Sequence, residues 1–151
     1  MRRILGVALV WLGAVAPVGA GAERDYGVRS LTGLSAVRVE VCSPEGVDPV
    51  DAEVALLLRL REAGLAVAAD APAVLRADVR AGADTASAEL TLTQAMCLER
   101  DPVFSERVAT WFQGTAARGG GEGEQGVAAV AGLATLVDEF VGDWRRANAR
   151  R

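Results

Sequence analysis

The chain has 151 residues, with 20 acidic and 16 basic side chains and a formal net charge of −4. It contains no histidine, which excludes Ser-His-Asp and Cys-His nucleophilic catalysis and every zinc site that needs a histidine ligand. Every basic residue is an arginine and no long basic run occurs, so nucleic acid and anionic membranes are not expected as main partners.

The first residues follow the pattern of a secretory signal peptide. Two arginines precede an apolar run over residues 4–15, and the small-residue pattern Ala20-Gly21-Ala22 follows. The run is about 12 residues long, shorter than the roughly 20 that cross a bilayer. Cleavage is expected after Ala22; two of these 22 residues are arginines, so the mature chain has 129 residues and a formal charge of −6. We expect an exported protein, periplasmic or extracellular, with no stable membrane anchor; a retained amino-terminal anchor is the alternative.

A mature chain of this size forms a single domain with its own core. Residues 23–35 are polar with two glycines and predict an extended lead-in. Residues 36–147 carry the periodic patterns of one α+β domain, and residues 148–151 are expected to form a tail.

The domain opens with a strand and a helix. Residues 36–43 alternate between valines on one face and Arg38, Glu40 and Cys42 on the other, which predicts a half-buried strand. In the helix that follows, Asp48 is placed as the N-cap and Gly64 as the C′ residue, with a proline at the first position. Its apolar stripe is traced by Val50, Val54, Leu57 and Arg61 and broadened by Leu56, Leu58 and Leu60.

Four more strands and a helix complete the domain. The short apolar segment 65–70 predicts the second strand of a βαβ-like unit. Residues 73–81, 87–98 and 103–116 predict a meander of three strands, with a turn over 82–85. The last helix has a stripe of large apolar residues: Val130, Leu133, Val137, Phe140 and Trp144. Three acidic residues, Asp138, Glu139 and Asp143, lie off that stripe and are expected to be solvated.

A glycine cluster, RGGGEG over residues 118–123, leads into the last helix. Glycine-rich turns before helices can hold a phosphate on their backbone N–H groups. Here Glu122 and Glu124 occupy the helix entry and would repel a phosphate, and the chain has no lysine. The cluster therefore predicts a flexible connection.

The element order is β-α-β-β-β-β-α. It predicts a two-layer α+β sandwich, a mixed and mostly antiparallel sheet of about five strands with two helices on one face.

The two cysteines predict one structural disulfide, Cys42–Cys97, in an oxidising compartment. Both fall near the carboxyl ends of their strands, so the first and fourth strands should be close and roughly parallel. This direction follows if the crossover from the first strand to the second is parallel and the next two connections, from the second strand to the third and from the third to the fourth, are reversals. The alternative is two unpaired thiols. A redox role would favour a CxxC motif, which the sequence lacks.

Adjacent strand residues point to opposite faces, so Trp111 and Phe112 cannot both enter one core. Phe104, Val108 and Phe112 share a face and are assigned inward. Trp111 then lies outward with Arg107, on the open sheet face that also carries Arg38, Arg76 and Arg80, where it would contact a partner or an acidic ligand. The alternative is that Trp111 is covered by the lead-in or lies beside a bulge.

Carboxylates are plentiful, but no spacing separates an acid–base pair from solvated surface. Neither a catalytic motif nor a cofactor or metal site is predicted.

The segments VRVEV, LRLREAGLAV, ATWFQG and LVDEFVGDWRRAN resemble a family of small exported bacterial proteins of uncharacterised function. More remotely, the element order is similar to the amino-terminal domain of the Tol-system propeller protein. That resemblance implies an interaction role in the envelope and transfers no catalytic residue.

These observations favour an exported, non-catalytic binding or adaptor domain that contacts envelope proteins through its open sheet face or an edge strand. Two alternatives stay open. One is a His-independent carboxylate hydrolase acting on an envelope or extracellular polymer, and the other is an accessory domain that binds a small molecule.

Overall fold

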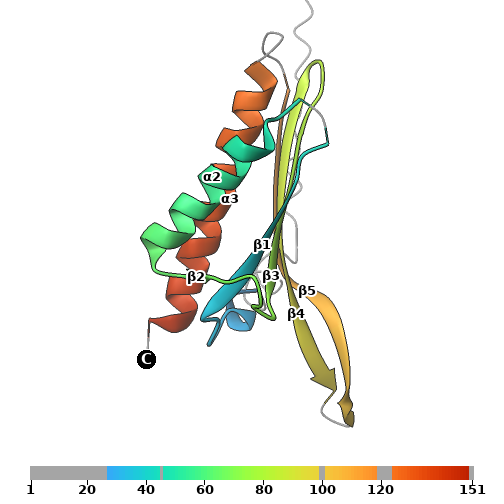
Figure 1. Cartoon of the computed structure of the whole chain (residues 1–151), viewed down its shortest axis with the longest axis vertical. Coiled ribbons are helices and arrows are strands. Elements are labelled where there is room, and N and C mark those ends of the chain that lie inside the picture. Colours follow the sequence, from blue (N-terminus) through green and yellow to red (C-terminus); the bar gives the residue numbers. More distant parts are fainter. Residues whose placement is uncertain (1–26, 45, 99–100, 119–123, 150–151) are drawn as a thin grey trace, which may run out of the picture.

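The computed structural model describes residues 27–44, 46–98, 101–118 and 124–149; of residues 97, 98 and 101–105 only the backbone is described. Figure 1 shows one sheet with both helices on the same side of it, which confirms the predicted α+β sandwich. In chain order the elements are β1 (Ala36–Cys42), α2 (Pro49–Ala63), β2 (Ala66–Val67), β3 (Val74–Ala81), β4 (Thr85–Leu98), β5 (Asp101–Arg118) and α3 (Glu124–Asn148).

The strand order in the sheet is β2-β1-β3-β4-β5. β1 is parallel to both β2 and β3, and β4 is antiparallel to β3 and β5, so the predicted meander of the last three strands is confirmed. The predicted reversal between β2 and β3 was wrong. β2 pairs only with Ala36 and Val37; the chain then crosses to the other side of β1 and pairs with Arg38–Cys42 as β3.

The ends of α2 are formed as predicted. The Asp48 carboxylate accepts a hydrogen bond of 2.8 Å from the Val50 N–H, and Gly64 adopts the left-handed conformation, with φ of 84°. The centre of the apolar stripe predicted for this helix is not buried, although two of the leucines predicted to broaden it are. The side chains that face the sheet are Ala52, Leu56 and Leu60, whereas Val50 and Val54 are exposed.

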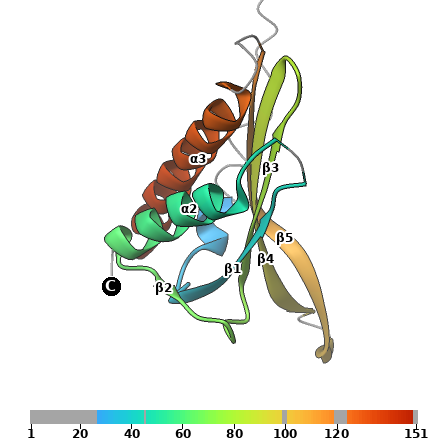
Figure 2. The same cartoon turned by 45° about the horizontal axis from the view of Figure 1, so that its top comes forward.

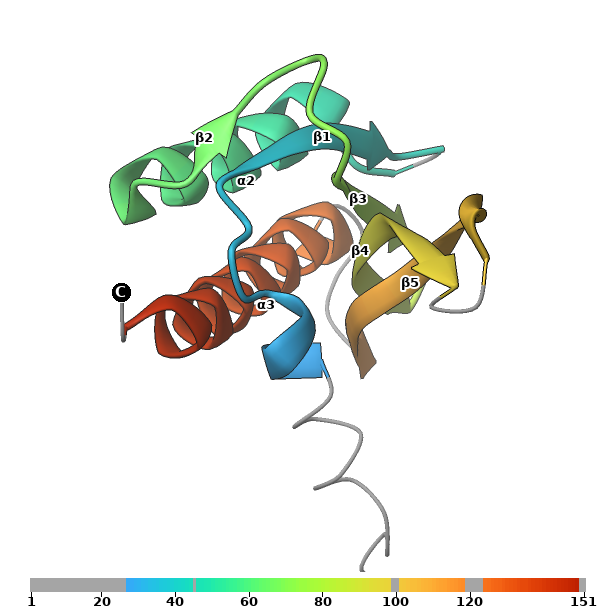
Figure 3. The same ribbon diagram turned by 90° about the horizontal axis from the view of Figure 1, so that it is seen from below.

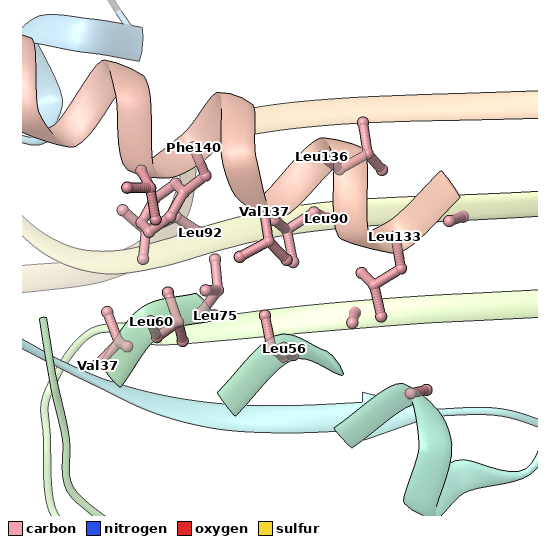
Figure 4. Packing of buried hydrophobic residues seen from close by; sticks show 14 of the residues in the cluster. Val37, Leu56, Leu60, Leu75, Leu90, Leu92, Leu133, Leu136, Val137 and Phe140 are labelled. Atoms are coloured by element: carbon pink, nitrogen blue, oxygen red, sulfur yellow. The ribbon is translucent and has the colours of Figure 1, made fainter. Parts of the chain in front are cut away.

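The core lies between the helices and the sheet. Leu133, Val137 and Phe140 of α3 are fully buried, as predicted, and Val130 and Trp144 pack partly buried against them. Figure 4 shows Leu133, Val137 and Phe140 meeting leucines of α2, β3 and β4: Leu56, Leu60, Leu75, Leu90 and Leu92. By length and composition α3 is apolar enough to cross a membrane, and a buried core helix meets the same criterion.

The lead-in belongs to the domain and is not extended over the residues described. Residues 27–30 form a helical turn, and Leu31 and Leu34 are buried in the core. The Asn148 side chain accepts a hydrogen bond from the Gly33 N–H at 2.8 Å and donates one to the Leu31 carbonyl at 3.0 Å. Asn148, predicted to begin the tail, is therefore the last residue of α3. The signal-like segment 1–22 and glycines 119–123 lie outside the described residues.

Candidate binding surfaces

The long hairpin of β4 and β5 is interrupted by a β-bulge. Leu92 pairs with Trp111 but the next residue, Thr93, pairs with Ala109, so Thr110 is an extra residue on β5. Its hydroxyl donates to the Gln94 side-chain carbonyl at 2.6 Å, and its own carbonyl accepts from the Ser30 hydroxyl at 3.0 Å. A bulge bends a strand, and Figure 2 shows the far part of this hairpin leaving the helix layer.

The extra residue reverses the alternation of β5. Before the bulge, Val108 lies on the inward side of the strand, as predicted. After the bulge, Trp111 and not Phe112 points into the core, and Trp111 is only 4% exposed. The expected outward position of Trp111 was therefore wrong. Both parts of the alternative hold, because Trp111 lies beside a bulge and the amino-terminal segment covers it. A Cβ placed on Gly27 would lie 3.3 Å from the Trp111 ring.

Trp111 links β5 to the carboxyl-terminal end of α3. Its indole N–H donates to the Asp143 carboxylate at 3.0 Å, and its ring meets the Phe140 ring edge-on with centroids 5.1 Å apart. Asp143, expected to be solvated, is buried and also accepts a hydrogen bond from Arg146. Figure 3 shows the helical turn of residues 27–30 beside α3 and β5. We call Trp111, Phe140, Asp143 and Arg146 the clamp. Its role is structural, since its buried polar atoms form hydrogen bonds with one another.

Phe112 was predicted to point inward, but it lies on the outward face where Trp111 was expected. It is 58% exposed, on the sheet face that the helices leave uncovered. The pairing places it in one row across the sheet with Thr91, Arg76 and Glu40. After Phe112, Gly114 and Ala116 share its face, so β5 presents small side chains beside one aromatic ring.

By register all four predicted arginines lie on this side of the sheet. Arg38, Arg76 and Arg80 are on β1 and β3, whereas Arg107 is on the far part of the β4–β5 hairpin, beyond the bulge. Arg76 donates two hydrogen bonds to Asp78, of 2.8 and 3.0 Å, and Arg38 pairs with Glu40 at 3.0 Å. The hydrogen bond from Arg76 lowers the pKa of Asp78 below its usual value, and Asp78 in turn raises the pKa of Arg76. Arg80 lines a shallow hollow of about 330 Å³ at the β3–β4 turn.

The structure does not support the disulfide between Cys42 and Cys97. Cys42 pairs with Asp78 on β3, and Asp78 pairs with Glu89 on β4, eight residues before Cys97. At about 3.4 Å per residue, the two Cα atoms are separated by more than roughly 25 Å, whereas a disulfide needs less than about 7 Å. The prediction failed because β1 and β4 run antiparallel, with their carboxyl ends at opposite ends of the sheet. Cys42 is a partly exposed free thiol on the uncovered face.

Most of the candidate carboxylates have structural partners or lie apart. Glu40 and Asp78 pair with arginines, Asp138 pairs with Arg59 at 3.3 Å, and Asp143 belongs to the clamp. Glu89 and Glu139 are exposed. In the part of the chain that the structure describes, no three Asp, Glu, Cys or His side chains gather where they could hold a metal ion.

Sequence reasoning missed a second apolar surface, on the outside of the helix layer. Val50, Val54 and Leu58 are 61, 56 and 52% exposed, and together they form the outer stripe of α2. Between this stripe and α3 lies a groove of about 620 Å³, whose lining includes Asp51, Val127, Ala131 and Ala134. The signal was present in the sequence, since apolar residues at i, i+4 and i+8 occur twice on this helix.

Neither the protein-family models nor the curated proteins contain a match to this chain. Among solved structures, the crystal structure of a minor lipoprotein from Acinetobacter baumannii aligns with a TM-score of 0.36 and 14% identity, over 76% of this chain and 93% of that one. A TM-score of this size carries no inference about function. The similarity to the amino-terminal domain of the Tol-system propeller protein is not supported by these comparisons.

Proposed function

We propose that this protein is an exported, non-catalytic binding domain, and that an extended segment of another envelope protein docks on the uncovered sheet face along β5. The observation that carries the proposal is Phe112, a large aromatic side chain that is 58% exposed on a face without helices. Burial of one such ring in a partner contributes a large share of the affinity of a typical protein interface.

The edge of β5 supports an extended partner. β5 is the last strand in the sheet order, so its outer backbone groups have no neighbouring strand in the described part of the chain. Such an edge can add a strand from another protein, which supplies main-chain hydrogen bonds while side-chain contacts give specificity. The Phe112 ring lies against Gly114, where a Cβ would be 3.8 Å from it, and it remains 58% exposed to a partner.

The charges on the same face indicate what the docked segment carries. Asp78 and Glu40 are already paired with arginines, whereas Arg80 and Arg118 take part in no ion pair among the described residues. A segment with an apolar side chain for Phe112 and carboxylates for these arginines fits best. The signal-like amino terminus supports a location where such envelope partners occur.

The alternatives have weaker support. A small-molecule site would need a pocket between the helices and the sheet, but that space is filled by fully buried side chains, Leu56, Leu75, Leu90 and Leu133 among them. The α2–α3 groove contains the Asp48 and Asp51 carboxylates, but Asp48 is engaged in capping α2. No observation therefore favours carboxylate catalysis over binding.

The test compares two single variants in capture from a detergent-solubilised envelope fraction. We expect Phe112→Ser to lose the captured partner, and Val127→Ser, a matched exposed apolar residue on the helix layer, to retain it. Each captured protein is identified, purified and tested for direct binding to both variants. Circular dichroism and thermal unfolding check that both remain folded. Equal direct binding by the Phe112→Ser variant and the unchanged protein would refute the proposed surface.

A further inference from the structure

Residues 27–30, which we call the amino-terminal turn, lie beside β5, the strand that the proposed function uses (Figure 3). The Ser30 hydroxyl donates a hydrogen bond of 3.0 Å to the Thr110 carbonyl. Gly27 is buried, and a Cβ placed on it would lie 3.8 Å from the same carbonyl oxygen. The turn therefore fills the space beside Thr110 and uses a backbone acceptor that a docked strand would otherwise use.

Exposure along β5 changes sharply at the amino-terminal turn. Thr110 and Trp111 are 5% and 4% exposed, whereas Phe112 is 58% exposed and residues 114–118 are all exposed. On the other side of the bulge, Ala109 is exposed again. Within the part of the chain that the structure describes, the turn thus divides the edge of β5 into two open stretches. One is residues 112–118, and the other lies on the far part of the hairpin.

The residues that follow the amino-terminal turn hold it in place. Leu31 and Leu34 are buried in the core. The Leu31 carbonyl accepts a hydrogen bond from Asn148, and the Leu34 carbonyl accepts one of 2.8 Å from the Trp144 indole N–H. A partner strand that ran past Thr110 would have to remove the turn from β5 against these contacts.

A fixed end is useful to a docked strand on this edge. The register of an added strand is weakly specified where side chains are small, because the strand can slip along its neighbour by two residues. Gly114 and Ala116 provide such a stretch after Phe112. A turn that closes one end of the stretch prevents slippage in that direction.

We propose that the amino-terminal turn ends the docking site, so that the extended segment pairs with β5 over Phe112–Arg118 and stops at the turn, with Ser30 as a positioning residue. This proposal rests on the proposed function and adds the length of the docked segment to it. Residues 112–118 span about 20 Å at about 3.4 Å per residue, so a stretch of about seven residues is expected to dock. The far part of the hairpin lies outside the contact.

The first test places the photo-crosslinking residue p-benzoylphenylalanine at position 116 or at position 109. Both positions are exposed alanines on the same side of the sheet, but Ala116 lies inside the proposed contact and Ala109 lies beyond the turn. The probe is the purified partner from the Phe112-dependent capture. We expect a crosslink from position 116 and none above background from position 109. Equal yields from the two positions would overturn the proposal.

The second test removes the end of the site. Ser30→Asp places a carboxylate opposite the Thr110 carbonyl, and because both groups are acceptors the turn should leave β5. A crosslink from position 109 should then appear. Ser30→Thr keeps the hydroxyl and should retain the boundary, and Thr32→Asp, at an exposed position, controls for the added charge. A boundary unchanged by Ser30→Asp would show that the turn does not set it.

The results distinguish this proposal from the proposed function. Binding that does not depend on Phe112 refutes the proposed function and the docking boundary together. Phe112-dependent binding with crosslinks from both sides of the turn refutes only the boundary. Thermal unfolding of each variant checks that it is folded, and the comparison of positions 116 and 109 in the chain with Ser30 intact does not depend on the Ser30 variants.

Discussion

The two helices cover the same face of the sheet but distribute their apolar side chains differently. α3 directs its large residues, Leu133, Val137 and Phe140 among them, into the core and leaves mainly small or polar side chains outside. α2 divides its large aliphatic residues between the core and solvent, with Leu56 buried and Leu58 more than half exposed. An apolar stripe therefore identifies a buried face only when the opposite face is polar.

The sharpest test of this contrast uses two leucines of α2, Leu56 and Leu58. Leu56→Ala should lower the free energy of unfolding by about 2–5 kcal/mol, because it leaves a cavity in the core. Leu58→Ala should change it by no more than about 0.5 kcal/mol, because Leu58 is exposed. Urea unfolding monitored by circular dichroism measures both values at a protein concentration where the chain is monomeric. Similar losses from the two variants would contradict the assignment of the faces.

A smaller effect is expected where α3 is attached to β5. Trp111→Phe removes the N–H group that donates to the buried Asp143 carboxylate and should lower the free energy of unfolding by about 1–3 kcal/mol. Phe112→Leu, at the adjacent exposed position, is the control and should stay within about 0.5 kcal/mol. If both substitutions are neutral, the clamp does not stabilise the domain.

Two glycines of α3 differ in the space around them, which is crowded at Gly126 and open at Gly142. A Cβ at Gly126 would lie 2.7 Å from the backbone carbonyl oxygen of Gly46, so Gly126→Ala should destabilise the protein by about 1–3 kcal/mol. Gly142 has no atom within 4 Å of that position, and Gly142→Ala should stabilise it by about 0.5–1 kcal/mol. Thermal unfolding of the two variants should thus shift in opposite directions, and shifts in the same direction would contradict the packing.

The smallest effect lies on the uncovered face and depends on pH. Arg76 lowers the pKa of Asp78 below its ordinary 3.8, so this pair stabilises the fold above that pH and loses its contribution as pH falls through the lower folded-state pKa. Arg76→Gln should therefore be less stable than the unchanged protein at pH 6, and the difference should shrink below pH 3.8. Arg61→Gln on α2 is the control. A difference independent of pH would mean that Arg76 acts through something other than Asp78.

Local signals in the sequence were sufficient to predict the helices and strands, but they were not sufficient to predict how the strands are arranged in the sheet. The cap at Asp48, the left-handed Gly64 and the stripe of α3 depend on near neighbours, and all were confirmed. The direction of β3 depends on how six residues cross β1, for which no local pattern exists. The same holds for the two cysteines, whose separation follows from strand direction alone.

The candidate site was predicted in kind but not in position. An exposed aromatic residue beside arginines on the open face was expected, and such a residue exists, but it is Phe112 rather than Trp111. Strict alternation cannot show where a strand contains an extra residue, since Thr110 does not differ in type from other strand residues. The outer stripe of α2 was missed because its valines fit either face.

The bulge at Thr110 also bears on how related sequences should be compared. Ala109 and Trp111 already occupy consecutive places in the pairing with β4, so a chain without Thr110 would continue the ladder with every other side chain on its present face. Loss of Thr110 would thus change no facing in β5, and it would remove the hydrogen bonds of Thr110 with Gln94 and Ser30. In an alignment of relatives we expect a single-residue gap here, with the tryptophan column intact beside it, although gaps inside strands are usually regarded as errors.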